Sequence, residues 1–191
     1  MMKAEKKLLI LAVSFCLAQG VTHGRESLLD QLSGETVVPR EANTIYLVPF
    51  KNMTKHSALP DRITSKLSSL IVSDGRLAIH KEMDAADTVL EGKIKNLQTQ
   101  PLTFNSFGRE DKKRLRIVVS VKLTDNRKQR VIFDDPEIQA FIEFSEITPP
   151  ITSEIQAVEN LIDSLSKRIF SKIISGWYTN EMTNIEKGKK Q

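Results

Sequence analysis

One alternating stretch, residues 112–124, constrains the fold of this chain more than any other. Every second side chain in its central part is apolar, and a β-strand with a period of two places all of them on one face. These apolar positions are Leu115, Ile117, Val119, Val121 and Leu123. Lys112, Arg114, Arg116 and Lys122 fall on the opposite face. The pattern predicts a strand roughly 44 Å long at about 3.4 Å per residue, with one apolar face and one cationic face.

The cationic face has two interpretations. It can be a bed for an anionic amphiphile, because a row of cations would lie beside apolar surface. It can equally be a solvated sheet face, whose Lys and Arg residues confer solubility and protect the sheet edge. Spacing alone favours the second interpretation, so the neighbouring segments have to decide.

Composition fits one globular domain with tails. The chain has 191 residues, of which 40% are hydrophobic and 27% are charged, and its formal net charge is +4. The positive residues concentrate in one region, residues 109–130, so a local patch is more informative than the total charge.

The first residues predict an export signal. Three lysines precede an apolar run over residues 8–17, which is too short to span a bilayer. Residues 1–20 are therefore interpreted as a signal peptide, and the polar residues 21–42 as a tether. Cleavage after Gly20 would leave a chain without a lipid anchor. Cleavage before Cys16 would leave a lipoprotein acylated there, although Phe15 is bulky for such a site. Both alternatives stay open.

The next segments predict a strand, a helix and a second strand. Residues 44–50 are apolar and β-rich, and residues 76–80 form a short strand after the break at Gly75. Between them, helical spacing connects Leu59, Ile63, Leu67 and Ile71. This order favours parallel pairing of the two strands with a right-handed crossover.

A meander of longer strands should follow. Residues 87–98 alternate again and should pair antiparallel with residues 112–124, through an irregular link at 99–111 that exposes Phe104 and Phe107. A turn at 125–129 leads to a returning strand at 130–144, interrupted by Pro136. This arrangement would bring five cations onto one surface, namely Lys93, Lys95, Arg114, Arg116 and Lys122.

A long helix closes the expected domain. Ser153 and Gln156 form a capping-box pattern, and apolar residues follow at spacings of three and four to about Gly176. The predicted fold class is α+β, a mixed four- to five-stranded sheet with two helices packed on one face, in the order β-α-β-β-β-β-α. The domain would cover residues 43–178, and residues 179–191 would be a disordered polar tail.

No motif indicates catalysis. His23, His56 and His80 lack Cys, Asp or Glu at the spacing of metal ligands, and no Gly-rich phosphate loop or nucleophile motif occurs. The sequence therefore predicts a protein that is not an enzyme and needs no metal or cofactor. Export argues against a nucleic-acid partner, although Phe104 and Phe107 could stack on bases.

Four segments in order resemble one family. They are TIYLVPFKNMT, DGRLAI, ADTVLEGKI and FGREDKKRLRIVVSVKLTD, and a closing helix ends in GWY. Together these segments, spanning residues 44–177, resemble the LptE family of lipopolysaccharide (LPS)-assembly lipoproteins. The chain departs from the family at Phe15 and lacks a CGY-like start after the acylated cysteine.

The resemblance implies a partner and a set of contact residues. It implies a non-enzymatic outer-membrane protein on the periplasmic side that binds LPS and docks in the lumen of the β-barrel LptD. The family's LPS contacts correspond here to Arg109, Lys112, Lys113, Arg114 and Arg116. Cations would pair with lipid A phosphates, and Phe104, Phe107 or Val118 would touch acyl chains.

An alternative family remains open at this point. The opening strand ends in VPFKN, which is also found in periplasmic interaction domains that activate cell-wall synthases or serve secretion as accessory lipoproteins. That motif alone does not distinguish these roles from LPS assembly.

Overall fold

The computed structural model describes residues 43–188, with side chains up to Gly176. The whole core of the described residues lies within the unit Val37–Gln191. A fragment of residues 37–191 therefore retains every residue of the described core. The predicted signal peptide, the tether and Cys16 lie outside the described residues.

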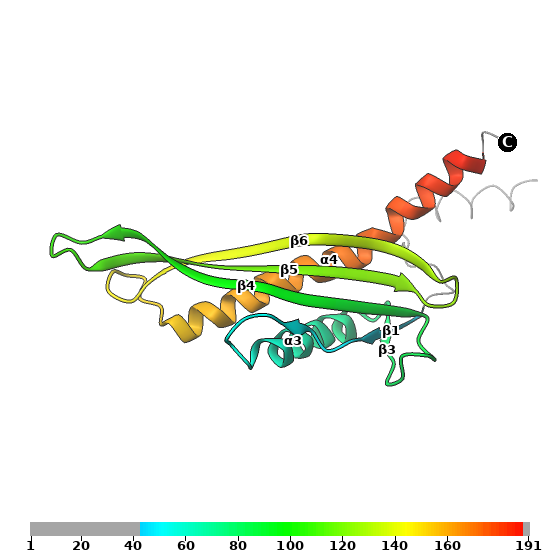
Figure 1. Cartoon of the computed structure of the whole chain (residues 1–191), viewed down its shortest axis with the longest axis horizontal. Helices are drawn as coiled ribbons and strands as arrows, with labels where there is room; N and C mark the ends of the chain where they lie inside the picture. The colour runs from blue at the N-terminus through cyan, green and yellow to red at the C-terminus, as the bar shows by residue number, and fades with distance from the viewer. Residues whose placement is uncertain (1–42, 189–191) are drawn as a thin grey trace, which may run out of the picture. The chain divides into compact units, whose positions relative to one another are not determined.

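The described residues form a six-stranded mixed sheet with two helices on one face (Figure 1). The strand order is β3-β1-β4-β5-β6, and β2 pairs with β4 outside this path. The elements are β1 (Thr44–Leu47), β2 (Lys51–Asn52), α3 (Leu59–Asp74), β3 (Ala78–Ile79), β4 (Thr88–Phe104), β5 (Glu110–Asp125), β6 (Arg130–Ser145) and α4 (Glu154–Gly188). The predicted α+β class is confirmed, and the two-residue strand β2 is an addition to it.

The parallel part of the sheet is built around β1. This strand lies between β3 and β4 and is parallel to both, with Ile45 opposite Ile79 and Thr88. Helix α3 connects β1 and β3 as the predicted crossover. It ends at Gly75, whose φ of 77° lies in the left-handed region that glycine adopts without strain.

The antiparallel part of the sheet supplies most of the buried apolar residues that the sheet contributes to the core. Strand β5 pairs with β4 on one side and with β6 on the other. Its alternating apolar residues are all buried, as predicted: Leu115, Ile117, Val119, Val121 and Leu123. They pack in one cluster with α3 residues such as Leu67 and α4 residues such as Leu165. Burial of this face leaves the opposite face of the three long strands without a helix.

The expected link at residues 99–111 is largely strand. β4 continues to Phe104, and Thr99 pairs with Leu115 while Pro101 pairs with Lys113. Pro101 is tolerated there because β4 has no neighbour other than β5 beyond Ile94, so the missing N–H costs no ladder bond. The prediction of an irregular link was therefore wrong, and only a short turn remains.

The expected end of the last helix near Gly176 was also wrong. α4 continues to Gly188, so helical backbone covers most of segment 179–191, for which the sequence predicted a disordered tail. A Cβ built on Gly176 would lie 2.7 Å from the ring of Phe133 on β6. The glycine therefore permits close packing of the helix on the sheet and does not stop the helix.

Within residues 43–188, no helix is both long enough and apolar enough to cross a membrane.

Candidate functional site

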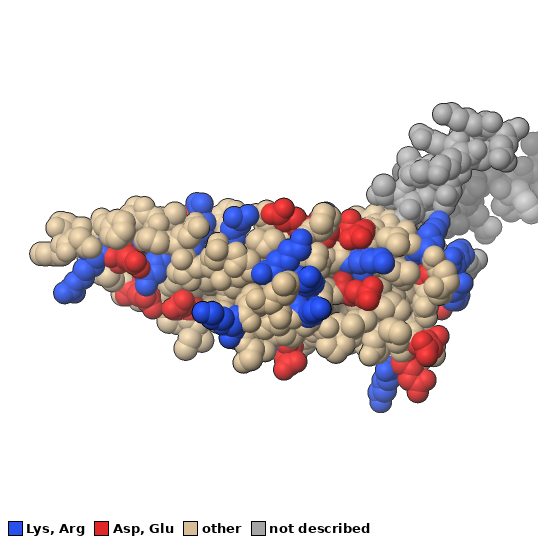
Figure 2. Space-filling view, viewed as in Figure 1, with Lys and Arg blue, Asp and Glu red and all other residues tan. Residues whose placement is uncertain are grey.

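The candidate site is the open face, which we define as the face of β4, β5 and β6 opposite α3 and α4. Period two places Lys112, Arg114, Arg116 and Lys122 of β5 there, because the intervening residues are buried under the helices. Figure 2 shows Lys and Arg distributed over the sheet, with Asp and Glu among them. The face therefore carries both signs of charge.

Strand β4 adds two lysines to the open face. Lys93 lies opposite Ser120. Ser120 is two residues before Lys122 on β5, so both of them, and Lys93 with them, lie on the open face. A bulge between Ile94 and Asn96 accommodates Lys95, whose Nζ donates to the carbonyl of Pro136 on β6 at 2.7 Å. Lys95 must cross β5 on the open face, because the other face is filled by the core. The five cations predicted to share a surface do so.

Acidic and amide side chains of β6 bind the two central arginines. Arg114 Nη2 lies 2.5 Å from Glu143 Oε1, and its guanidinium lies 5.1 Å from the centre of the Phe141 ring. Arg116 donates from Nε and Nη2 to Gln139 Oε1 at 3.0 and 2.6 Å, and a carboxylate oxygen of Glu137 lies 3.9 Å from its Nη2. The expected row of outward cations is present, but its two central arginines are bound by side chains of β6.

Four other cations on or near the open face have no such partner. Among the residues that the structure describes, these four cations have side chains that form no ion pair and no hydrogen bond: Lys93, Arg109, Lys112 and Lys122. Arg109 and Lys112 are exposed at the β4–β5 turn, whereas Lys93 and Lys122 are half-buried within the sheet. These four cations can accept an anionic ligand without first losing an ion pair or a side-chain hydrogen bond.

Lys113 does not lie on the open face. It has the parity of the buried residue Leu115, and its Nζ lies 3.1 Å from Glu146 and 3.7 Å from Glu110. The hydrogen bond to Glu146 raises the pKa of Lys113, and the same bond lowers the pKa of the Glu146 carboxyl. The resemblance placed Lys113 with Arg114 because they are adjacent in sequence, but adjacent residues of a strand point to opposite faces.

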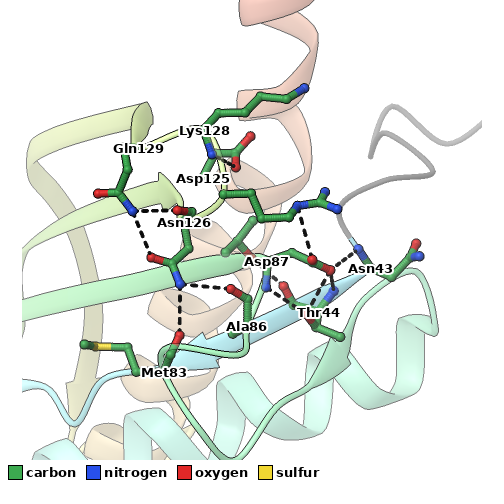
Figure 3. A network of polar contacts seen from close by, with 11 residues as sticks. Asn43, Thr44, Met83, Ala86, Asp87, Asp125, Asn126, Lys128 and Gln129 are labelled. Carbon is green, nitrogen blue, oxygen red and sulfur yellow. Dashed lines mark hydrogen bonds and ion pairs between the residues drawn. The ribbon is translucent and has the colours of Figure 1, made fainter.

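At the other end of the sheet, a polar network joins β1 to the start of β4 and the β5–β6 turn (Figure 3). Asp87 Oδ2 accepts hydrogen bonds from the backbone N–H of Asn43 and Thr44 and from the Thr44 hydroxyl, at 2.9 to 3.0 Å. Its other oxygen lies 3.3 Å from Arg127. Burial raises the pKa of Asp87, but the Thr44 hydrogen bonds and the charge of Arg127 outweigh it, so the pKa lies below its usual value.

The same network holds the loop before β4. The Asn126 side-chain amide donates to the carbonyls of Met83 and Ala86 at 3.1 Å each, and its backbone N–H donates to the carbonyl of Asp87 at 2.8 Å. Sequence reasoning missed this network, although the Asp87 and Asn126 positions beside strand ends are typical of side chains that bond to backbone. Its hydrogen bonds join β1, the loop before β4 and the β5–β6 turn at this end of the sheet.

The described residues offer no metal centre. Residues 43–188 contain no group of three or more His, Cys, Asp or Glu side chains that could hold a metal ion. His56 lies in the loop before α3, and His80 accepts from or donates to the backbone of Glu82. The chemistry that the open face offers is therefore pairing of its cations with anions.

Comparisons with solved structures identify the fold. The chain is similar to the hypothetical protein CT253 from Chlamydia trachomatis, with a TM-score of 0.55 and 12% identity over 71% of this chain and 97% of that one. It is also similar to the uncharacterized lipoprotein B from Nitrosomonas europaea, with a TM-score of 0.53 and 13% identity over 74% of this chain and 88% of that one. A third similar structure is protein XCC0632 from Xanthomonas campestris, with a TM-score of 0.54 and 8% identity over 73% of this chain and 88% of that one.

Sequence comparison identifies the family. No curated protein matches the chain. The family model described as LptE, lipopolysaccharide-assembly, matches residues 42–175, which is more than half of the chain and includes both helices' packed parts and every long strand. On this match, the protein belongs to the LptE family of lipopolysaccharide-assembly proteins.

Proposed function

We propose that this protein is a non-enzymatic component of the outer-membrane LPS translocon. In this role it binds LPS on the open face, and it docks inside the LptD β-barrel and supports it during outer-membrane assembly. Family membership supports the role in LPS assembly. The observation that carries the binding proposal is the uncovered face of β4 and β5 with its cations in one plane.

The ligand groups would divide into two kinds. Lys93, Arg109, Lys112 and Lys122 would receive lipid A phosphates directly, since they give up no partner. Arg114, Arg116 and Lys95 would have to exchange a protein partner for a phosphate. Exposed ion pairs stabilise a protein by only about 0–1 kcal/mol, so this exchange is energetically accessible. Lys113 is left out of the proposed set because it faces the helix layer.

Apolar surface beside these cations would contact acyl chains. Val118 is half-buried on the open face between Arg116 and Ser120, and Phe141 is exposed beside Arg114. A guanidinium that stacks on an aromatic ring can still donate hydrogen bonds in its own plane. The face thus combines phosphate-binding groups with apolar side chains, as an anionic amphiphile requires.

The lipid-binding part of the proposal can be tested with residues 37–191. We expect this fragment to bind lipid A in a manner that weakens as salt rises, because exposed charges are screened. The double charge reversal Arg114→Glu/Arg116→Glu should lower the affinity at least tenfold. The control Lys81→Glu/Lys167→Glu makes the same change in net charge away from the open face. Equal binding by both double variants would contradict the proposed site.

Location and partner need separate measurements. The exported leader and the family support an outer-membrane position on the periplasmic side, and Cys16 would be the lipid anchor if cleavage precedes it. An intact mass of the mature protein distinguishes an acylated chain starting at Cys16 from a chain starting at Val21. Co-purification of a large outer-membrane barrel would support docking to LptD, whereas recovery of a cell-wall synthase would contradict it.

A further inference from the structure

The β4–β5 hairpin projects beyond the helix layer (Figure 1). Residues 98–104 of β4 are exposed, and the buried residue of β5 nearest the turn is Leu115. β6 ends at Ser145, which pairs with Lys112. In the described part of the chain, no third strand pairs with the hairpin beyond this point. Neither the core nor a neighbouring strand therefore fixes the end of the hairpin that carries Arg109.

Two side chains of β5 bind residues at the end of β6 and in the loop that leads to α4. Asp111 Oδ1 accepts hydrogen bonds from the hydroxyls of Ser145 and Thr148, at 3.2 and 2.6 Å. Lys113 Nζ donates to a carboxylate oxygen of Glu146 at 3.1 Å. Asp111 and Lys113 are two residues apart, so both point to the helix side of the strand and away from the open face. We call these five residues the hairpin latch.

The loop side of the hairpin latch is itself held in place. Ser145 is buried, and its hydroxyl oxygen accepts from the backbone N–H of Thr148 at 2.8 Å. The hydrogen bond and the charge of Lys113 lower the pKa of the Glu146 carboxyl, and a hydrogen bond from the backbone of Glu154 lowers it further. Glu154 is the first residue of α4. The hairpin latch therefore connects the projecting hairpin to the start of the long helix.

We propose that Lys113 and Asp111 are positioning residues for LPS binding, an inference that rests on the proposed function. By binding the β6–α4 loop on the helix side of β5, they fix the direction in which the hairpin projects. Arg109 and Lys112 are thereby held at the turn end of the open face. A cation that is held in place binds an anion more tightly than one on a mobile arm, because less conformational entropy is lost on binding.

A positioning role for Lys113 differs from a contact with LPS. The resemblance in sequence implies that Lys113 touches LPS, whereas its Nζ lies beside Glu146 and Glu110 and its side chain is 22% exposed. A contact with a phosphate requires the lysine itself. An ion pair between β5 and the loop requires only two opposite charges, whichever strand or loop carries each of them. Exchanging the charges of Lys113 and Glu146 therefore separates the two roles.

The test exchanges these charges in the full chain. Lys113→Glu breaks the ion pair, and Lys113→Glu/Glu146→Lys restores a pair of opposite charges without changing the net charge. The control Lys66→Glu makes the same change in net charge as Lys113→Glu, at an ion pair with Asp163 that joins α3 to α4. Isothermal titration measures the affinity for lipid A, and hydrogen exchange of the amides of residues 98–114 reports on the hairpin without ligand. Urea midpoints check that each variant is folded.

Asp111→Ala tests the other half of the hairpin latch. It removes the acceptor of the Ser145 and Thr148 hydroxyls and also removes one negative charge. Charge alone predicts tighter binding of an anion, whereas loss of positioning predicts weaker binding. We expect a loss of about two- to threefold in affinity for lipid A, with faster exchange in the hairpin. A gain in affinity would overturn the role given to Asp111.

We expect Lys113→Glu to bind lipid A roughly fivefold more weakly than Lys66→Glu, with faster exchange in the hairpin. The charge-exchanged variant should bind within about twofold of the unmodified chain. If it bound as weakly as Lys113→Glu, the proposal would be overturned, because LPS would then need the lysine itself. Equal affinity and equal exchange in Lys113→Glu and Lys66→Glu would also overturn it. Failure of the proposed function is distinguishable, because the unmodified chain would then bind no lipid A.

Discussion

Arg114 and Glu143 are cross-strand partners on β5 and β6, and their side chains form an ion pair with a distance of 2.5 Å between Nη2 and Oε1. Both side chains are substantially exposed on the open face. An anionic ligand that binds Arg114 therefore competes with a carboxylate that the protein itself supplies. Such competition keeps the arginine oriented in the absence of ligand and lowers the affinity for any phosphate that replaces the glutamate.

Removing the competing carboxylate should strengthen binding. We expect Glu143→Gln to raise the affinity for lipid A about two- to fivefold, because an exposed ion pair is worth up to about 1 kcal/mol. Isothermal titration of residues 37–191 with lipid A measures the change. The control Asp134→Asn removes the same charge from the same strand and face, and Asp134 lies opposite Lys122 without an ion pair to either arginine. A rise that is no larger for Glu143→Gln than for Asp134→Asn would show that overall charge alone matters.

The network around Asp87 should make stability depend on pH in acid. The folded-state pKa of Asp87 is lowered, so its contribution is fully present above the unfolded value of about 3.9 and is lost as the pH falls through the folded value. Asp87→Asn should therefore flatten the fall in the free energy of unfolding below about pH 4.

At pH 7, Asp87→Ala should lower the free energy of unfolding by about 1–3 kcal/mol, because three donors lose their acceptor. Urea unfolding at a series of pH values measures both effects. Asp84→Asn is the control, since it changes an exposed carboxylate in the preceding loop. If the free energy of unfolding of Asp87→Asn fell as steeply below about pH 4 as that of the unmodified protein, the role given to this carboxylate would be contradicted.

Gly92 should not tolerate a larger residue. A Cβ at this position on β4 would overlap the ring of Phe50, which is itself buried in the core. We expect Gly92→Ala to lower the free energy of unfolding by about 1–3 kcal/mol through overpacking, and Phe50→Leu in the same chain to recover part of that loss. Denaturant midpoints measure this double-mutant cycle. The control Ser120→Ala, on the open face, should change the free energy of unfolding by less than about 0.5 kcal/mol. If the effects of the Gly92 and Phe50 changes were additive, the contact between the two residues would be contradicted.

The sequence predicts the fold where a periodic pattern coincides with burial. The alternation in β5 identified its buried face, because a shift of one residue would have placed five apolar side chains in water. The extent of β4 was missed because Pro101 is typical of a loop, and only its place at a sheet edge makes it compatible with a strand. The end of α4 was missed because Gly176 resembles a helix stop. In the structure, a glycine at this position instead leaves room for the ring of Phe133 on β6, which is distant in sequence.

The sequence predicts which cations share the candidate site, but it does not predict which side chains bind them. Lys93, Arg114, Arg116 and Lys122 follow from two alternating segments and one antiparallel pairing. The partnership of Glu143 and Gln139 with the arginines depends on the register of β6. That register includes shifts, one of them between Val119 and Val121 near Pro136, which local patterns do not determine.

The central claim is that LPS contacts the open face. Its most direct test places the photo-crosslinker p-benzoylphenylalanine at Val118, in the middle of this face, or at Val72, an exposed residue of α3 on the helix layer. The full chain is irradiated in Gram-negative cells that express it, and adducts are detected with an antibody against LPS. We expect an LPS adduct from the Val118 position and none from the Val72 position. Adducts of equal yield at both positions, or an adduct only at Val72, would contradict the account.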